Sequence, residues 1–135
     1  MQKITLSIKD IYSLDNELKG VRNDTGVILL QGLLQQKLPI VVKYWVSDLS
    51  KKLDEIKKGV EEIRLELFHK YGKISEDGKS LKIKDDESKE KLQNEHDELF
   101  NQTREIEVYH FKLFEFGSIE TSDHYDIFFR LISPE

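Results

Sequence analysis

Residues 39–71 carry the clearest structural signal and read PIVVKYWVSDLSKKLDEIKKGVEEIRLELFHKY. Apolar residues recur here at alternating spacings of four and three, the heptad pattern of a helix with one apolar seam. The seam consists of Val42, Val46, Leu49, Leu53, Ile56, Val60, Ile63 and Leu67. Because Pro39 suits a first helical turn and Gly72 suits a helix end, the pattern predicts one helix over about 39–71, roughly 50 Å long at about 1.5 Å per residue.

A second helix is expected to run back along the first. Residues 74–81 read as a small β-hairpin in which Asp77-Gly78 forms the turn and Ile74 faces Leu81. The acidic residues 85–87 then favour a helix start, and this helix is expected to reach about residue 104 or 106. Its seam is thinner, because His96 and Thr103 alternate with the apolar positions. We therefore expect the first helix to have more apolar surface than the second can cover.

Flanking segments complete the predicted fold. Ser7 caps a helix over about 8–19, and the apolar run 27–34 fits either a short buried helix or a strand, of which we favour the helix. A short strand through 4–6 can pair with an aromatic-rich strand that begins near 106. In the C-terminal segment, Ser122 and Asp123 are expected to cap a closing helix that ends at Pro134.

These elements predict a mainly α fold with a minor β part. We expect one domain over 1–135, with N-terminal helices in 8–36, a long antiparallel helical hairpin in 39–106 whose tip is 73–84, and a strand plus a terminal helix in 107–135. The small β element would join N-terminal and C-terminal strands.

Charge is distributed unevenly along the 135 residues, whose net charge is −5. Residues 1–47 hold six basic and four acidic side chains, whereas residues 106–135 hold two and six. Since nucleic-acid binding needs a concentrated basic face, we expect no nucleic-acid partner.

The chain contains no cysteine, so it has no disulfide and no thiolate metal site. No apolar run reaches the roughly 20 residues of a membrane span, and the first residues lack the apolar core of a signal peptide. We therefore expect a soluble protein with no membrane partner.

No catalytic, cofactor or metal site is predicted. The four histidines lack ligand spacing, and His96 is interpreted as a polar contact between helices. The triplet 122–124, Ser-Asp-His, contains the three residue types of a catalytic triad. However, triad residues come from separate chain segments, and adjacent residues at a helix start are far more typical of capping. No glycine-rich phosphate loop is present. The sequence thus predicts a protein that is not an enzyme.

The part of the seam that the second helix leaves uncovered must meet either the N-terminal helices or another chain, and we favour contact with another protein. Tyr44 and Trp45 fit either interface anchors or core packing, and Gly59 fits either a close helix crossing or a neutral position. The residues that we assign to partner binding are Tyr44, Trp45, Leu49, Leu53, Ile56, Ile74 and Leu81.

In their order along the chain, several segments resemble a family of small proteins of tailed phages and prophages that is classed as a domain of unknown function. The segments that carry this resemblance are 6–11, 37–44, 64–72 and the strand 106–113 followed by a terminal helix that ends in Leu131-Ile132. The resemblance implies a phage context and supplies no activity.

Taken together, these features lead us to expect a non-enzymatic phage protein that acts through protein contacts, either as a virion or tail component or as an assembly factor. It would work as an oligomer or a subunit of a complex, in the host cytoplasm or within the virion. The alternative is an intracellular inhibitor or modulator of a host defence or transcription protein, in which the acidic C-terminal third or the 74–81 tip makes the contact.

Overall fold

The computed structural model describes residues 1–116 and 125–133. Its helices are α1 (Ile8–Lys19), α2 (Ile40–Tyr71), α3 (Asp86–Phe100) and α4 (Asp126–Phe129), with 3-10 turns η1 (Leu33–Gln35) and η2 (Leu113–Phe116). Its strands are β1 (Gln2–Ser7), β2 (Gly20–Arg22), β3 (Ile28–Gln31), β4 (Gly72–Ile74), β5 (Leu81–Ile83), β6 (Thr103–Val108), β7 (Phe111–Lys112) and β8 (Ile132–Ser133). The strands pair two by two: β1–β6, β2–β3 and β4–β5 are antiparallel, and β7–β8 is parallel.

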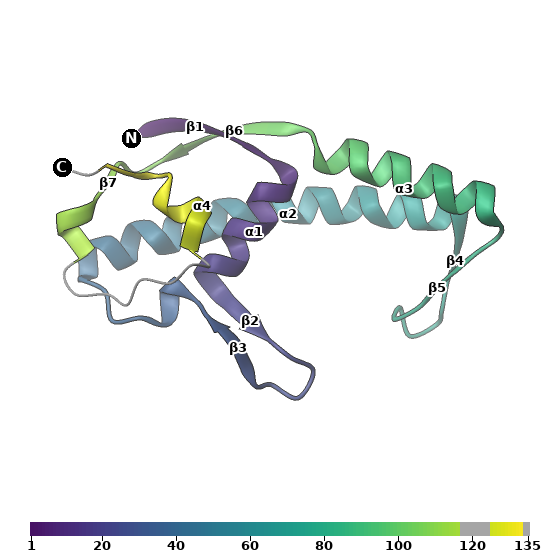
Figure 1. Cartoon of the computed structure of the whole chain (residues 1–135), viewed down its shortest axis with the longest axis horizontal. Helices are drawn as coiled ribbons and strands as arrows, with labels where there is room; N and C mark the ends of the chain where they lie inside the picture. Colours follow the sequence, from purple (N-terminus) through teal and green to yellow (C-terminus); the bar gives the residue numbers. More distant parts are fainter. Residues whose placement is uncertain (117–124, 134–135) are drawn as a thin grey trace.

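A broad head and a narrow stalk share the helix α2 (Figure 1). In the head, α1, α4 and the paired strands β1 and β6 gather around the first half of α2. In the stalk, α3 runs beside the second half of α2, and the β4–β5 hairpin lies at the far end. The β2–β3 hairpin projects from the head on the side opposite to β6.

The prediction of a mainly α fold is wrong. The structure is 57% helical and 23% strand, which makes it an α+β fold with one long helix. Several strands have only two to four residues, and such short segments show no periodicity that distinguishes them from turns or short helices. They become strands because a partner segment supplies the hydrogen bonds.

The apolar run 27–34, for which we favoured a helix, forms β3 followed by the short turn η1. The side chain of Asn23 accepts hydrogen bonds from the backbone N–H groups of Thr25 and Val27 at 3.0 and 2.9 Å, and these bonds close the turn between β2 and β3. Gly20, with φ 83°, leads the chain out of α1 into β2. The turn chemistry at both ends therefore outweighs the weak helical tendency of the run.

The predicted long helix is confirmed, since α2 is continuous over 32 residues. Its N-cap is Pro39, and Gly72 follows its last turn. The first half of the seam is buried, and the core residues that it contributes are Val42, Val46, Leu49 and Leu53. These side chains pack in one core with apolar residues of α1, namely Ile11, Leu14 and Leu18.

The predictions for the first strand and the first helix are confirmed. The side chain of Ser7 accepts the backbone N–H of Asp10 at 3.0 Å, so α1 begins where the capping pattern places it. The strand β1 pairs with β6, and Ile4 lies opposite Ile106. However, α3 ends at Phe100, earlier than predicted, because the chain from Thr103 joins β1 instead of extending the helix.

The C-terminal segment differs most from the prediction. The closing helix is reduced to the four residues of α4, and Ile132 enters β8 beside Phe111. The predicted caps Ser122 and Asp123 lie outside the described residues. The carboxylate of Glu17, buried in α1, accepts the backbone N–H groups of Ile127 and Phe128 at 3.2 and 2.9 Å. This buried acceptor holds the short helix against the head.

Candidate interaction surfaces

The two aromatic residues predicted as anchors are placed differently. Trp45 is half-buried, and its ring stacks on that of Tyr109 with centroids 5.0 Å apart and an angle of 4°. Tyr44 meets Trp45 edge to face and is 63% exposed. Trp45 thus fastens α2 to the segment after β6, whereas Tyr44 is free to contact a partner.

Leu49 and Leu53 do not belong to a partner surface. They are 2% and 0% exposed, and they lie in the core of the head. Their assignment to partner binding is therefore corrected: α1 covers this part of the seam, which the helical hairpin alone leaves open. Heptad spacing identifies which face of a helix is apolar, but it does not identify what covers that face.

Ile74 and Leu81 lie opposite each other in β4–β5, as the hairpin pattern predicts. Both are half-buried. In the same ribbon, Lys73 lies opposite Lys82, and both side chains are exposed. The exposed face of the β4–β5 hairpin is therefore basic.

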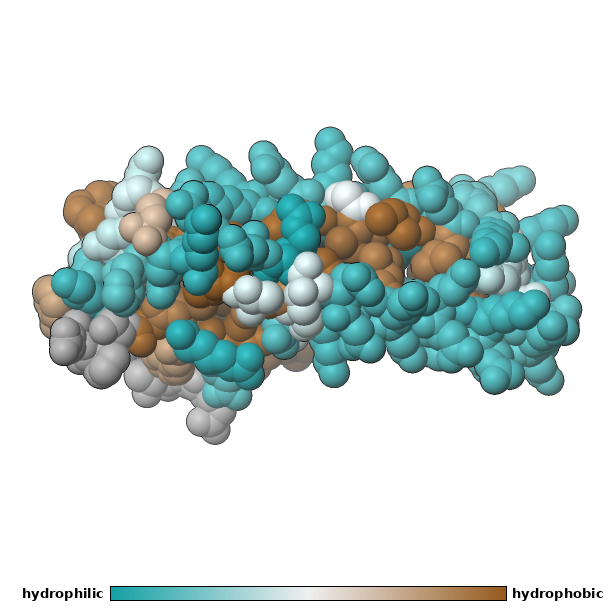
Figure 2. Space-filling view, turned by 90° about the horizontal axis from the view of Figure 1, so that it is seen from above, coloured by the Kyte–Doolittle hydropathy of each residue, from teal (hydrophilic) through white to brown (hydrophobic). Residues whose placement is uncertain are grey.

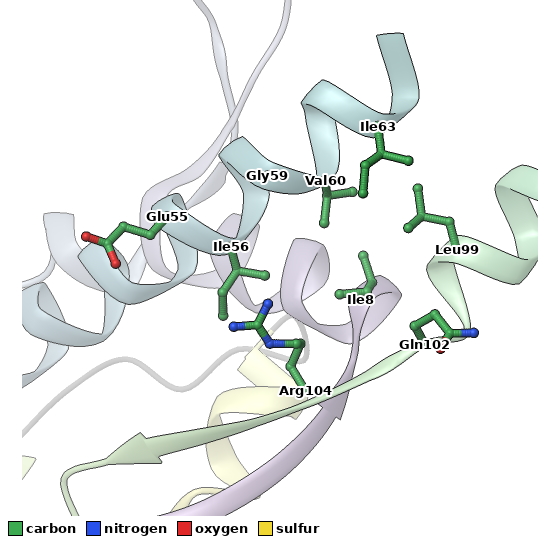
Figure 3. Close-up of a pocket in the computed structure, with 9 residues that line it drawn as sticks. All are labelled: Ile8, Glu55, Ile56, Gly59, Val60, Ile63, Leu99, Gln102 and Arg104. Carbon is green, nitrogen blue, oxygen red and sulfur yellow. The ribbon is translucent and has the colours of Figure 1, made fainter. Parts of the chain in front are cut away.

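The second half of the seam is only partly covered, since Val60 is buried, Ile56 and Leu67 are half-buried and Ile63 is exposed. The recess along it is what we call the α2–α3 groove. Its deeper part has a volume of about 340 Å³ and is lined by Ile8, Glu55, Ile56, Gly59, Val60, Ile63, Leu99, Gln102 and Arg104. Figure 3 shows apolar side chains that point toward one another across it, namely Ile8, Val60, Ile63 and Leu99. Toward the stalk it continues past Leu67 between the two helices.

This part of α2 is incompletely covered because α3 has few apolar side chains facing it, and Leu92 is the one residue of α3 that is buried. Ile63 is consequently 45% exposed. Seen from above, the apolar surface lies between rows of hydrophilic side chains over the stalk (Figure 2). The expectation that the second helix covers only part of the first is confirmed for this half of α2. Gly59 marks no close helix crossing, since a Cβ built there meets nothing within 4 Å.

The β2–β3 arm, residues 20–31, is a surface that the sequence analysis missed. Four consecutive apolar residues are 57%, 52%, 60% and 40% exposed, namely Val27, Ile28, Leu29 and Leu30. The arm projects away from the head (Figure 1). In the described part of the chain, β3 has no strand neighbour other than β2. The turn residues 23–26 directly before the apolar run were the signal available for it.

A polar cluster joins α1, α2 and α3 beside the groove. The carboxylate of Glu61 accepts hydrogen bonds from Tyr12 Oη at 2.6 Å and from Arg64 Nη1 at 2.7 Å. Arg64 Nε donates to His96 Nε2 at 3.2 Å, and the His96 ring stacks on Phe100. The predicted interhelical role of His96 is thereby confirmed.

The pKa directions define the charges of this cluster at neutral pH. Burial lowers the pKa of His96, and the Arg64 cation lowers it further, against the weaker opposite effects of Asp97 and Glu61. Burial alone would raise the pKa of Glu61, but the hydrogen bonds from Tyr12 and Arg64 outweigh it and lower that pKa. His96 is therefore neutral and accepts from Arg64, while Glu61 is ionised.

Replacing His96 by glutamine is expected to flatten the pH dependence of stability between about pH 7 and 5. Because its pKa is lower in the folded than in the unfolded state, the unfolded chain takes up the proton first, and stability falls as the pH drops through this range. Glutamine keeps an acceptor for Arg64 but does not titrate. Urea unfolding at several pH values measures the slope, and an unchanged slope in H96Q would contradict the assignment.

Across residues 1–116 and 125–133, no three His, Asp or Glu side chains converge to hold a metal ion. His124, in the triplet weighed above, lies outside those ranges. Within them, no helix combines the length and apolar character needed to cross a membrane.

Comparisons of this chain with protein-family models, with curated proteins and with solved structures found no match.

Proposed function

We propose that this protein is a non-enzymatic interaction module that docks on another protein, as a structural component of a phage virion or as an assembly factor. The observation that carries the proposal is the β2–β3 arm. Four consecutive apolar residues are exposed on this hairpin, which projects from the head. The resemblance of the sequence to small phage proteins supports the phage context.

The β2–β3 arm is a two-stranded ribbon with an apolar run that is exposed to water. A two-stranded ribbon is at best marginally stable in water, and it needs a further strand or an apolar surface against one face. Within the described residues, only the base of the arm has such support, where β2 and β3 lie against α1 and Tyr125 Oη donates to the Gln31 carbonyl at 2.9 Å. The side chains of Val27, Ile28 and Leu29 are each more than half exposed. A partner that covers the arm removes apolar surface from water, at about 25 cal/mol per Å². Docking therefore completes a layer that the chain by itself leaves open.

Leu29→Lys is expected to deplete the protein from its complex at least ten-fold, because it places a charge in the centre of the apolar run. The matched control is Leu65→Lys, which makes the same change at a leucine that is 50% exposed on α2, outside the arm and the groove. Both substitutions are at exposed positions, so we expect each to change stability by less than about 0.5 kcal/mol.

The readout is the amount of each variant in purified particles of the encoding phage and in complexes separated by size from infected cells. Equal retention of the two variants would contradict the role of the arm.

The alternative, a modulator of a host protein, is favoured by one observation on the β4–β5 hairpin. Like charges directly opposite each other in a ribbon are destabilising, and Lys73 and Lys82 pair with no described carboxylate. An acidic protein surface would relieve this repulsion. Under this alternative, the chain is absent from particles, and its complexes survive Leu29→Lys but not Lys82→Glu.

A further inference from the structure

The molecule carries both a projecting apolar element and an apolar recess. The β2–β3 arm presents four neighbouring apolar side chains, and the α2–α3 groove is lined mainly by isoleucine, valine and leucine. We infer that the partner of the arm is a second copy of this chain, and that its acceptor is the α2–α3 groove of that copy. This inference rests on the proposed function and names the partner.

One molecule does not satisfy its own groove. The arm projects downward in Figure 1, whereas the apolar surface over the stalk is exposed in the view from above in Figure 2. The base of the arm is also held tightly: a Cβ built on Gly32 would lie 2.3 Å from the carbonyl carbon of Lys19. Since this contact fixes the direction in which the arm leaves the head, the groove that receives it belongs to another copy.

The charges permit this contact between two acidic molecules. Each copy has a net charge of −5, so random encounters between copies are repulsive. Residues 25–36, however, contain no charged side chain, which is unusual in a chain that is 35% charged. The deeper part of the groove is lined by one acid and one base, Glu55 and Arg104, and its continuation toward the stalk adds Glu95 and Glu98, which an uncharged arm does not oppose. Arm and groove therefore meet without net repulsion.

The surface area indicates how strong one contact is. About half of each apolar residue in the arm is exposed, so the arm offers on the order of 300–400 Å². Arm and groove together would bury on the order of 700 Å², below the roughly 1,200–2,000 Å² of stable interfaces. A single contact is thus weak, and association rises steeply with protein concentration.

Because the donor and acceptor surfaces differ, the contact is heterologous, and a pair of copies joined by one contact still has one free arm and one free groove. Such contacts close into a ring or propagate as a filament. When a ring closes, the last arm and groove already belong to the same assembly, so their effective concentration is high. The closed ring is therefore more stable than an open chain with the same kind of contact.

The natural absence of cysteine allows a direct test by site-specific cross-linking. We would place Leu29→Cys in the arm and Ile63→Cys in the groove, two exposed positions, and treat the purified variants with a short bis-maleimide. The double variant is expected to give a ladder of covalent dimers, trimers and larger species, and an equal mixture of the two single variants is expected to give dimers only. Leu29→Cys combined with Lys79→Cys, at the exposed β4–β5 tip, is the control that stays monomeric.

Two results would overturn the inference. Dimers from Leu29→Cys alone would show that arms pair with arms, and a double variant that stays monomeric would show that the arm does not reach the groove. Dimers without larger species would mean that two copies exchange arms reciprocally. Independently, light scattering of the wild type over a concentration series is expected to show a rising mass, which Leu29→Lys and Ile63→Lys each shift to at least ten-fold higher concentration. A wild type that stays monomeric throughout, while Leu29→Lys is still depleted from particles, would reject self-assembly and leave the proposed function with a different partner.

Discussion

Truncation of Leu53 to alanine is expected to destabilise the fold by about 3–5 kcal/mol, among the largest effects of any single substitution in this chain. Leu53 is 0% exposed and lies in the part of the seam that packs with α1 in the core. The truncation removes a buried isobutyl group and leaves a cavity that the rigid helices on either side fill only in part. Small domains have total stabilities of about 5–15 kcal/mol, so such a loss approaches global unfolding.

The matched comparison is Tyr44→Ala, nine positions earlier on the same helix. Tyr44 is 63% exposed and contributes an edge contact to Trp45, so its removal should cost less than about 1 kcal/mol. Urea unfolding of both variants, followed by circular dichroism, measures the difference. Comparable losses would mean that Tyr44 is a core residue, and a small loss for Leu53→Ala would mean that this part of the seam is not covered by its own chain.

Gly32→Ala is expected to cost about 3 kcal/mol or more and to detach the β2–β3 arm from the head. The added Cβ would lie 2.3 Å from the carbonyl carbon of Lys19 and 2.4 Å from the nitrogen of Gly20. Both atoms are backbone and are held by the end of α1, so neither moves without opening that end. In hydrogen-exchange measurements, Gly32→Ala is expected to exchange faster than the wild type in residues 20–31, with a smaller change in the rest of the head.

Gly59→Ala is the control for this substitution and has the opposite expected sign. Gly59 lies inside α2, and the added Cβ would meet no atom within 4 Å. Alanine in a helix interior is favoured over glycine by about 1 kcal/mol, so the midpoint of unfolding should rise. If both alanine variants changed stability in the same direction, the close contact at Gly32 would not be what holds the arm.

Local patterns in the sequence were sufficient for several elements. Heptad spacing alone predicted α2, because an amphipathic helix of 32 residues repeats its signal over many turns. Ser7 placed the start of α1, and Asp77-Gly78 placed the β4–β5 turn, since capping and turn formation depend on residues next to each other. The pairing of the N-terminal strand with the strand that begins near residue 106 was also predicted, as both segments favour strand, but its register was not.

Tertiary structure alone decided which surfaces are covered. Leu49 and Ile63 share one seam and one spacing, yet one is 2% and the other 45% exposed, because α1 packs on the first half of α2 and the sparse stripe of α3 on the second. Residues 28–31 of the run 27–34 became a strand because β2 and the Asn23 turn supply their hydrogen bonds. Burial depends on which distant segments meet, and periodicity within one segment carries no information about that partner. The sequence by itself therefore determined the long helix and its apolar face, whereas the contacts between segments decided the α+β class, the exposed arm and the open groove.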